Sequence, residues 1–286
     1  DCLLSRGLGD VYKRQGYVYA PRIAQKKGAI IIMERGSKHI LEQKKILEKN
    51  PHKKNEAIPN RNIKCNLKAY QFANFISVAS QHVKESFLLH QYPENRIFVN
   101  PYGVDLSMFK PLPNIPKKYD VIMVGGWGYE KGCDLIVEAI RKTNYSFIHV
   151  GSIKDVDFPQ EKNFTHIDPV DQSKLIEYYN QAKVFILPSR QDGFGMVLSQ
   201  ALACNLPIIG SNNCGAPDLK KMVELPEYIT IIKDYTADAI VTAIHTAIKN
   251  YEQLGERIYA GNAIENLTWE AYGKRYANFL HKIIKQ

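Results

Sequence analysis

The sequence has little of what marks a membrane-spanning, metal-binding or disulfide-bonded protein. None of its hydrophobic runs approaches the roughly 18 residues that a membrane-spanning helix needs. The five cysteines show no C-x-x-C spacing, and the eight histidines are dispersed. Scattered cysteines in a chain of 286 residues are typical of reduced packing residues in a cytosolic protein. We therefore predict a cytoplasmic protein without a disulfide framework or a metal site.

Signatures of nucleic-acid binding are also missing, although the chain is basic. The formal net charge is +9, but no RNP, zinc-finger or helix-turn-helix motif is found. Residues 16–103 carry 15 Lys or Arg against 6 Asp or Glu, whereas residues 104–286 carry 20 against 21. The charge is densest in "KKILEKNPHKKN" (44–55). A basic face of this kind binds anionic lipid or an acidic substrate, or is merely solvated, and no nucleic-acid partner is predicted.

The second part of the chain alternates short apolar runs with helical patterns. This alternation predicts a parallel sheet covered by helices on both faces, which is a doubly wound α/β domain. Ligands of such a domain bind at the carboxyl ends of the strands. The predicted strands are 119–124, 146–150, 183–188, 207–210 and 228–232, and the predicted helices are 132–142, 173–182 and 194–204.

The first part has fewer such elements. Apolar runs predict strands at 28–33, 75–80 and 96–100, with an amphipathic helix at 82–91 between the last two. The Pro-rich segment 110–118 is typical of a linker, because proline fixes φ and removes backbone donors. From Trp269 onward, apolar side chains recur every three or four residues, which predicts a terminal helix that docks on another element.

Two loops of the second part combine glycine with polar side chains, each between a strand and a helix. The first reads "VGGWGYEKGCDL" and contains Gly125, Gly126 and Lys131. A lysine in such a loop can meet a phosphate as a mobile point charge. Neither loop is a Walker loop or reads G-x-G-x-x-G. Together they predict a nucleoside-diphosphate site across adjacent strand ends.

The second loop lies in "LPSRQDGFGMVLSQ". Gly193 and Gly195 flank Phe194, which lets the backbone approach a ligand closely. The following helix begins with unpaired N–H groups and a partial positive charge, and both favour a phosphate. Asp192 lies in the loop and Gln200 lies about two helical turns along. One ligand could therefore touch both side chains.

Four segments, in order, resemble the motifs of family 4 glycosyltransferases, which are retaining enzymes of the GT-B fold. The segment "FVNPYGVDLSMFKP" (98–111) resembles the hinge before the donor domain, and "VGGWGYEKGCDLIVEAI" (124–140) resembles the "VGRL…KG" segment. The segment "LPSRQDGFGMVLSQALACNLPII" (187–209) resembles the E-x7-E signature of the family. The segment "TWEAYGKRYANFL" (268–280) resembles the terminal helix that crosses back to the first domain. The resemblance implies an α/β architecture of two Rossmann-like domains. Its parts are a partial acceptor-side domain at 16–109, the linker 110–118, a donor-binding domain at 119–267 and a terminal helix at 268–286.

The resemblance implies transfer of a sugar from a nucleotide-sugar donor to a glycan or lipid-linked acceptor, with retention of configuration and without a cofactor or metal. It implies that Asp192 faces the donor sugar and Lys131 contacts the diphosphate, so these two are the predicted catalytic residues. Gln200 takes the place of the second signature Glu, which holds the ribose hydroxyls. The other residues predicted to bind the donor are Gly125, Gly126, Arg190, Gly193, Phe194, Gly195 and Met196.

Three positions depart from the family pattern. Asp192 keeps the carboxylate but is one methylene shorter than Glu. At Gln200 an amide, which accepts at one atom and donates at the other, replaces a carboxylate that can accept from both ribose hydroxyls. Gly126 stands where the family usually has a diphosphate-binding Arg. We hypothesise that Arg190, just before the signature loop, supplies this missing charge.

Other candidate functional residues can be interpreted as either functional or structural. Arg35 and His39 follow the first predicted strand, where the family often has a functional His, so either could lie on the acceptor side or be structural. Asp155 and Asp157 form a lone D-x-D, a weak metal signal that GT-B enzymes do not need. Trp127 is predicted to pack at its loop rather than to stack on a ligand.

The first 15 residues stand apart from the rest. The segment "SRGLGDVYKRQ" (5–15) resembles a sequencing-library adapter translated in frame, so we expect residues 1–15 to be a non-native segment that packs on nothing of consequence. Gly16 would then mark a truncation. This interpretation agrees with three predicted strands in a domain that usually has about six.

An incomplete first domain leaves alternatives to an active transferase. One is a truncated or degenerate nucleotide-sugar-binding module without turnover, and another is a nucleotide-sugar epimerase of GT-B shape, against which the 187–209 signature argues. The basic first part suits an enzyme that works peripherally at the inner face of the cell membrane, because anionic lipids attract Lys and Arg.

Overall fold

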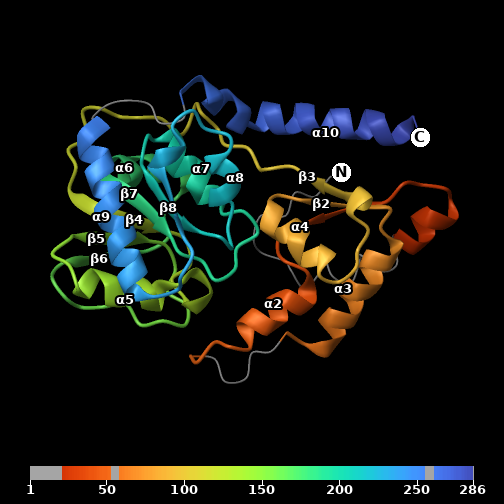
Figure 1. Cartoon of the computed structure of the whole chain (residues 1–286), viewed down its shortest axis with the longest axis horizontal. Coiled ribbons are helices and arrows are strands. Elements are labelled where there is room, and N and C mark those ends of the chain that lie inside the picture. The colour runs from red at the N-terminus through yellow and green to blue at the C-terminus, as the bar shows by residue number, and fades with distance from the viewer. Residues whose placement is uncertain (1–20, 53–57, 255–260, 286) are drawn as a thin grey trace.

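Two parallel β-sheets form the framework of the computed structural model, which describes residues 21–52, 58–254 and 261–285 (Figure 1). The N-terminal sheet has the order β1-β2-β3, and the C-terminal sheet has the order β6-β5-β4-β7-β8-β9. All strand pairs in both sheets are parallel. The predicted α/β class is therefore confirmed. The predicted adapter-derived segment 1–15 lies outside the described residues.

The C-terminal sheet is rich in Val, Ile and Phe, and its central strands are buried on both faces, as parallel strands require. Val121, Ile122 and Phe185 have no exposed surface. Its strands are β4 (Tyr119–Val124), β5 (Phe147–Val150), β6 (Phe164–Ile167), β7 (Ala182–Leu187), β8 (Ile208–Ser211) and β9 (Ile229–Ile232). The helices of this half are α5 (Cys133–Arg141), α6 (Leu175–Asn180), α7 (Met196–Ala203), α8 (Ala216–Lys220) and α9 (Ala237–Leu254).

The elements of this half that the sequence prediction omits include β6, α8 and α9. The strand β6 is a short edge strand in which Thr165 and His166 are half-buried, so it makes no apolar run. Helix α9 packs against α5 and β9 and covers the sheet. The single-turn 3-10 helices here are η2 (Tyr129–Lys131), η3 (Gln172–Lys174) and η4 (Pro226–Tyr228), and η5 (Gly261–Leu267) precedes the last helix.

The N-terminal sheet has its own hydrophobic cluster, in which Ile40, Ile76 and Phe87 are fully buried. The predicted strand 28–33 is wrong in its bounds: the chain turns at Gly28 with φ of 76° and becomes a strand only at Ile32. The strands are β1 (Ile32–Arg35), β2 (Phe75–Val78) and β3 (Ile97–Val99). The helices are α2 (Ile40–Leu47), α3 (Asn60–Phe72) and α4 (Gln81–Leu88), with the 3-10 helix η1 (Glu94–Arg96), and α2 and α3 were not predicted.

The last helix, α10 (Trp269–Ile284), starts in the C-terminal half and runs across to the N-terminal sheet (Figure 1). The Thr268 hydroxyl caps it by accepting from the Ala271 N–H at 3.1 Å. Phe279 stacks on Phe98 of β3 with ring centroids 4.1 Å apart. The apolar stripe of the sequence thus docks on the other half of the molecule.

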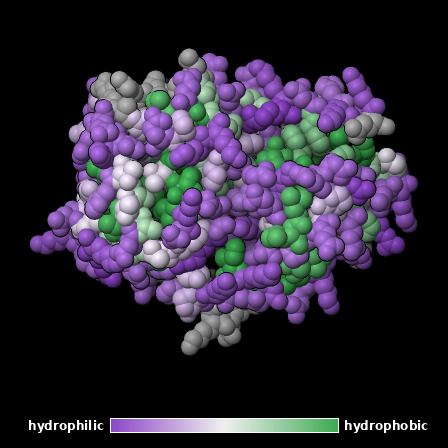
Figure 2. All heavy atoms as spheres, viewed as in Figure 1, coloured by the Kyte–Doolittle hydropathy of each residue, from purple (hydrophilic) through white to green (hydrophobic). Residues whose placement is uncertain are grey.

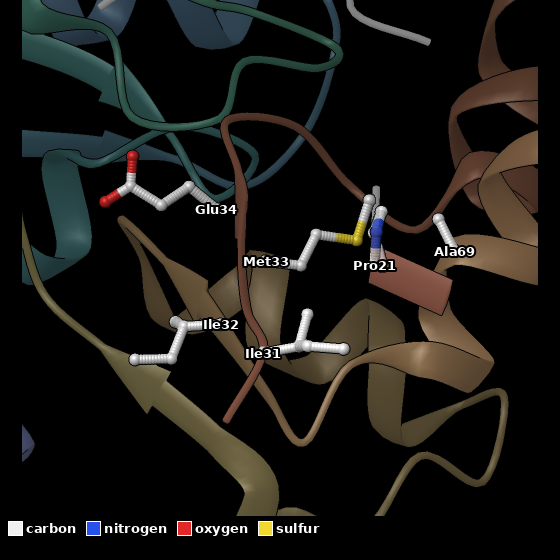
Figure 3. Close-up of a pocket in the computed structure, with 6 residues that line it drawn as sticks. All are labelled: Pro21, Ile31, Ile32, Met33, Glu34 and Ala69. Atoms are coloured by element: carbon white, nitrogen blue, oxygen red, sulfur yellow. The ribbon is translucent and has the colours of Figure 1, made fainter. Parts of the chain in front are cut away.

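Strand β1 forms one edge of the N-terminal sheet. Its side chains alternate, as those of a strand must: Met33 extends toward Pro21, and Glu34 points the opposite way (Figure 3). The apolar side faces a hollow of about 60 Å³, which is far smaller than a typical ligand pocket of roughly 300–1,000 Å³. Its lining residues are Pro21, Ile31, Ile32, Met33, Glu34 and Ala69.

The outer surface is mainly hydrophilic on the face seen in Figure 2, with hydrophobic residues in separate patches on both halves. Among the helices of the described segments, none combines the length and hydropathy needed to cross a membrane. Cys133, Cys204 and Cys214 are buried and unbridged, as predicted for packing residues, and Cys65 is unbridged and half-buried.

Candidate active site

The loops that follow β4 and β7 bring together the two predicted catalytic residues. Lys131 ends η2 after β4, and Asp192 lies in the loop after β7, 61 residues later. The Lys131 Nζ donates to the Asp192 Oδ2 at 2.5 Å. Since β4 and β7 are neighbours in the sheet, their carboxyl ends meet at one edge. Only 21% of the Lys131 side chain and 18% of the Asp192 side chain are exposed.

This ion pair keeps a partly buried lysine charged. Burial by itself would lower the pKa of Lys131, but the negative charges of Asp192 and Glu130 outweigh that effect and raise it. A charge-assisted hydrogen bond of this kind is short and strong. Lys131 therefore remains a cation at the strand ends, which is the form that can face a phosphate.

The signature loop is packed against the N-terminal half at its glycine. A side chain at Gly193 would overlap the carbonyl oxygen of Gly36, so only glycine allows this approach. Gly195, with φ of 77°, is the N-cap of α7, and Met196 begins that helix with 39% of its surface exposed. Phe194 is 1% exposed, so its side chain is a packing residue.

Polar contacts from the N-terminal half hold the loop on both sides of Asp192. The Ser80 hydroxyl donates to the Gly193 carbonyl oxygen at 2.5 Å. The Gln191 amide donates to the Ser37 hydroxyl at 2.6 Å. These contacts join residues more than 110 positions apart, and no motif in the sequence pointed to Ser37 or Ser80.

A cavity of about 220 Å³ lies beside Lys131, between the two halves. Asp155 closes one side of it: its Oδ1 accepts from the Tyr129 N–H at 2.9 Å, and its Oδ2 accepts from the Asn50 amide at 2.7 Å. This half of the D-x-D is thus an anchor between loops, and the described residues contain no group of three or more potential metal ligands. The cavity is lined by Leu47, Asn50, Gly126, Gly128, Glu130, Lys131, Lys154 and Asp155.

The Arg190 side chain is bound to Asp134, which does not fit the role hypothesised for it. Its Nη1 and Nη2 donate to the two carboxylate oxygens of Asp134 at 2.6 and 2.7 Å. Its Nη1 also donates to the Tyr129 carbonyl oxygen at 2.7 Å, and the guanidinium lies 3.8 Å from the centroid of the Tyr129 ring. Because these contacts hold the guanidinium and Arg190 does not line the cavity beside Gly126, they do not support it as the replacement cation there.

Gln200 is buried, and one of its two polar atoms is already engaged. The Tyr179 hydroxyl donates to the Gln200 Oε1 at 2.9 Å, and Tyr179 has no exposed surface. The Gln200 amide N–H groups are the part best able to reach a ligand hydroxyl, and there they would donate, whereas a carboxylate accepts. The predicted contact with ribose stays a prediction.

His39 has a structural position that contradicts the acceptor-side interpretation. It is 4% exposed, stacks on His90 with centroids 3.9 Å apart, and caps α2 by accepting from the Leu41 N–H at 3.4 Å. Burial lowers the pKa of His39 to about 3. Arg35 is likewise tied into its own loop, where it donates to the Lys38 carbonyl oxygen at 3.0 and 3.2 Å. Trp127 is fully buried, which confirms the packing prediction.

Solved structures show that this arrangement is the GT-B fold of glycosyltransferases. The chain matches a sucrose-phosphate synthase of Thermosynechococcus elongatus with a TM-score of 0.69 and 18% identity, covering 92% of this chain and 70% of that one. It matches HepE of Anabaena, solved with UDP and glucose, with a TM-score of 0.71 and 14% identity, covering 94% of this chain and 76% of that one.

The sequence defines the family within that fold. The model of the family described as glycosyl transferases group 1 matches residues 107–263, more than half of the chain. The chain therefore belongs to the glycosyl transferases group 1 family.

Two curated relatives align over most of the chain. A probable sucrose-phosphate synthase of Thermosipho melanesiensis is 26% identical over 242 residues, covering 75% of this chain. A GDP-mannose-dependent mannosyltransferase of Mycolicibacterium smegmatis, which acts on a phosphatidylinositol monomannoside, is 23% identical over 242 residues, covering 73% of this chain. The chain spans 56% and 62% of the lengths of these two relatives.

Proposed function

We propose that this chain is the greater part of a retaining glycosyltransferase that uses a nucleoside-diphosphate sugar as donor. The observation that carries the proposal is the pairing of Lys131 and Asp192 at 2.5 Å, at the carboxyl ends of adjacent strands and beside a cavity between the two halves. Group 1 membership and the GT-B fold support the same reaction class.

The expected chemistry is electrostatic. The bond between the anomeric carbon and the diphosphate oxygen breaks with its electron pair on the diphosphate, while positive charge develops on the sugar. Lys131 and the N-terminus of α7 stabilise the departing anion, and Asp192 lies where it can balance the charge of the sugar. The acceptor oxygen then forms the new bond on the same face and gives up its proton to the departing diphosphate.

The donor class is supported by the solved neighbours. HepE is solved with UDP and with UDP-glucose, and the mannosyltransferase relative depends on GDP-mannose. A hexosyl nucleotide is thus the proposed donor for this chain. Neither a metal nor a further cofactor has a place in the proposed reaction.

We propose a glycan or lipid-linked acceptor and a peripheral location at the inner face of the cell membrane. The excess of Lys and Arg over Asp and Glu in residues 16–103 supports this, because basic residues near anionic lipid contribute roughly 1 kcal/mol each. Co-sedimentation with anionic vesicles at low salt tests it: the chain should pellet with them and not with neutral vesicles.

Calorimetry against UDP-, GDP- and ADP-sugars, combined with a turnover assay, tests the activity. Binding with slow release of nucleoside diphosphate supports the transferase. Binding without turnover supports the truncated or degenerate binding module, and isomerised free sugar nucleotide supports an epimerase. Failure of every sugar nucleotide to bind would overturn the proposal.

A further inference from the structure

The loop after β5 lies directly on the glycine loop after β4. The Trp127 N–H donates to the Ser152 carbonyl oxygen at 2.8 Å, and the Lys154 N–H donates back to the Trp127 carbonyl oxygen at 2.9 Å. A side chain at Gly151 would overlap the Gly125 carbonyl oxygen, so the two backbones can approach only because Gly151 has none. Fully buried Trp127 anchors the pair of loops in the core.

This contact lays the Lys154 side chain over Gly126. A Cβ built on Gly126 would overlap the Lys154 Cε and lie 2.8 Å from its Nζ. Lys154 therefore occupies the space that any longer residue at position 126 would need. The flat backbone of the glycine loop and the lysine stem above it together form one wall of the cavity beside Lys131.

Lys154 lines this cavity and, among the described residues, forms no ion pair, although its charge reaches the Glu130 carboxyl. Lys131 is paired with Asp192, and Arg190 is paired with Asp134 outside the cavity lining. In the described parts of the chain, no carboxylate forms an ion pair with Lys154, which is an exposed residue.

The two carboxyl groups that line the cavity oppose an anion less than two free carboxylates would. Both oxygens of Asp155 already accept hydrogen bonds, from Tyr129 and Asn50. Burial raises the pKa of Glu130, so its carboxyl takes up a proton more readily than an exposed one when a second anion approaches.

We infer that the Lys154 ammonium, together with Lys131, binds the diphosphate of the donor, and that it supplies the charge missing at Gly126. This inference rests on the proposed function. Lys154 follows β5 and Lys131 follows β4, so the two cations approach the diphosphate from neighbouring strand ends. The glycine at position 126 leaves this space to Lys154, because a side chain there would push the lysine end aside.

Four variants of the 286-residue chain test the inference, with UDP and inorganic pyrophosphate as probes in calorimetry at low salt. Lys154→Ala should weaken both probes about tenfold, because a charged hydrogen bond is lost. Lys154→Arg should stay within about threefold of the parent, because the charge is kept. Lys174→Ala, at an exposed lysine of η3, is the matched control and should change nothing.

The fourth variant moves the cation between loops. In the Lys154→Ala background, Gly126→Arg should recover most of the lost affinity, because the space above residue 126 is now free and a guanidinium can fill it. If Lys154 only stabilises its own loop, an arginine at position 126, on another loop, should not recover the affinity. Thermal unfolding of each variant checks that all of them fold.

The outcomes separate this inference from the proposed function. If the parent binds UDP and Lys154→Ala binds it equally well, Lys154 has no role in binding and only the inference fails. If the parent binds neither probe, the inference fails, and the proposed function fails with it only if the UDP-, GDP- and ADP-sugars do not bind either. Weakening in Lys154→Ala and Lys174→Ala alike would also overturn it, since that pattern reports only net charge.

Discussion

The two sheets of the molecule differ in where the contacts that stabilise them come from. In the C-terminal sheet, four of the six strands have neighbours on both sides, and the hydrophobic cluster spans the sheet and its helices. Among the described strands of the N-terminal sheet, only β2 is flanked on both sides, and every residue of β3 is half-buried. Its aromatic cover comes from α10, which lies more than 150 residues further along the chain.

This difference explains where the candidate site is built. Lys131, Asp192 and Lys154 all follow strands of the self-sufficient C-terminal sheet, and the matched family region lies there as well. The N-terminal half contributes one wall, through Asn50 and the contacts of Ser37 and Ser80. The half with the larger hydrophobic cluster thus holds the charged groups, and the half that depends on α10 lines the other side of the cavity.

The largest expected effect distinguishes the carboxyl ends of β4 and β7 from their amino ends. Lys131→Ala should lower turnover by about 100-fold or more, because it removes the charge that stabilises the leaving group. Lys183→Ala is the control, because the Lys183 Nζ pairs with Asp120 at 2.8 Å between the same two strands, at their amino ends. It should leave turnover unchanged. Equal losses in a steady-state assay would show that the Lys131 pair is only structural.

The second prediction concerns the dependence of the N-terminal sheet on α10. Phe279→Ala removes the ring that stacks on Phe98 and should destabilise that sheet by about 2–3 kcal/mol, because a partly buried aromatic is lost. Hydrogen exchange should quicken in β2 and β3 while β4 and β7 stay protected. In Phe185→Ala, which opens the core of the C-terminal sheet, β4 and β7 should lose protection. Equal loss of protection from exchange in both sheets after Phe279→Ala would show that the N-terminal sheet does not depend on α10 more than the C-terminal sheet does.

The third prediction uses acid to weaken the N-terminal half. The pKa of His39 is about 3 in the folded state, against about 6.5 when unfolded, so between these values only the unfolded chain binds the proton. The stability from His39 is complete above about pH 6.5 and is lost as the pH falls. His39→Asn keeps the helix cap without a titrating group, so it should lose about 2 kcal/mol less than the parent between pH 7 and pH 5 in urea unfolding.

The parent and the variant must be compared directly, because Asp218 acts the opposite way. Burial raises its pKa to about 6, so the folded chain takes up a proton there as the pH falls. His281→Asn, at an exposed residue of α10, is the control and should follow the parent. Parallel curves for the parent and His39→Asn would contradict the role of His39.

The smallest expected effect distinguishes two cations of the C-terminal half. Arg190→Ala should change the affinity for UDP by less than about twofold, because its guanidinium is held by Asp134, whereas Lys154→Ala should change it about tenfold. Calorimetry at one salt concentration suffices. A tenfold loss in Arg190→Ala would restore the first hypothesis, in which Arg190 supplies the charge missing at Gly126.

Sequence patterns predicted the C-terminal sheet better than the N-terminal one. Runs such as 119–124 and 183–188 are apolar on both faces, and the observed β4 and β7 match them within one residue. Of the edge strands, β6 was missed because it is half polar, and β1 begins only after the turn at Gly28, whereas β3 and β9 match the predicted 96–100 and 228–232 within one residue. A half-polar strand, or a turn within an apolar run, leaves a weaker pattern.

The sequence by itself determined the fold class and the two glycine loops, because strand runs and helical periods are local properties of the chain, and its family resemblance predicted Lys131 and Asp192 as site residues. Only the tertiary structure decided which side chains meet. It paired Arg190 with Asp134, buried His39, tied Asn50 to Asp155 across 105 residues and laid Lys154 over Gly126. These contacts depend on how separate strand ends and two domains pack, and no local pattern encodes that geometry.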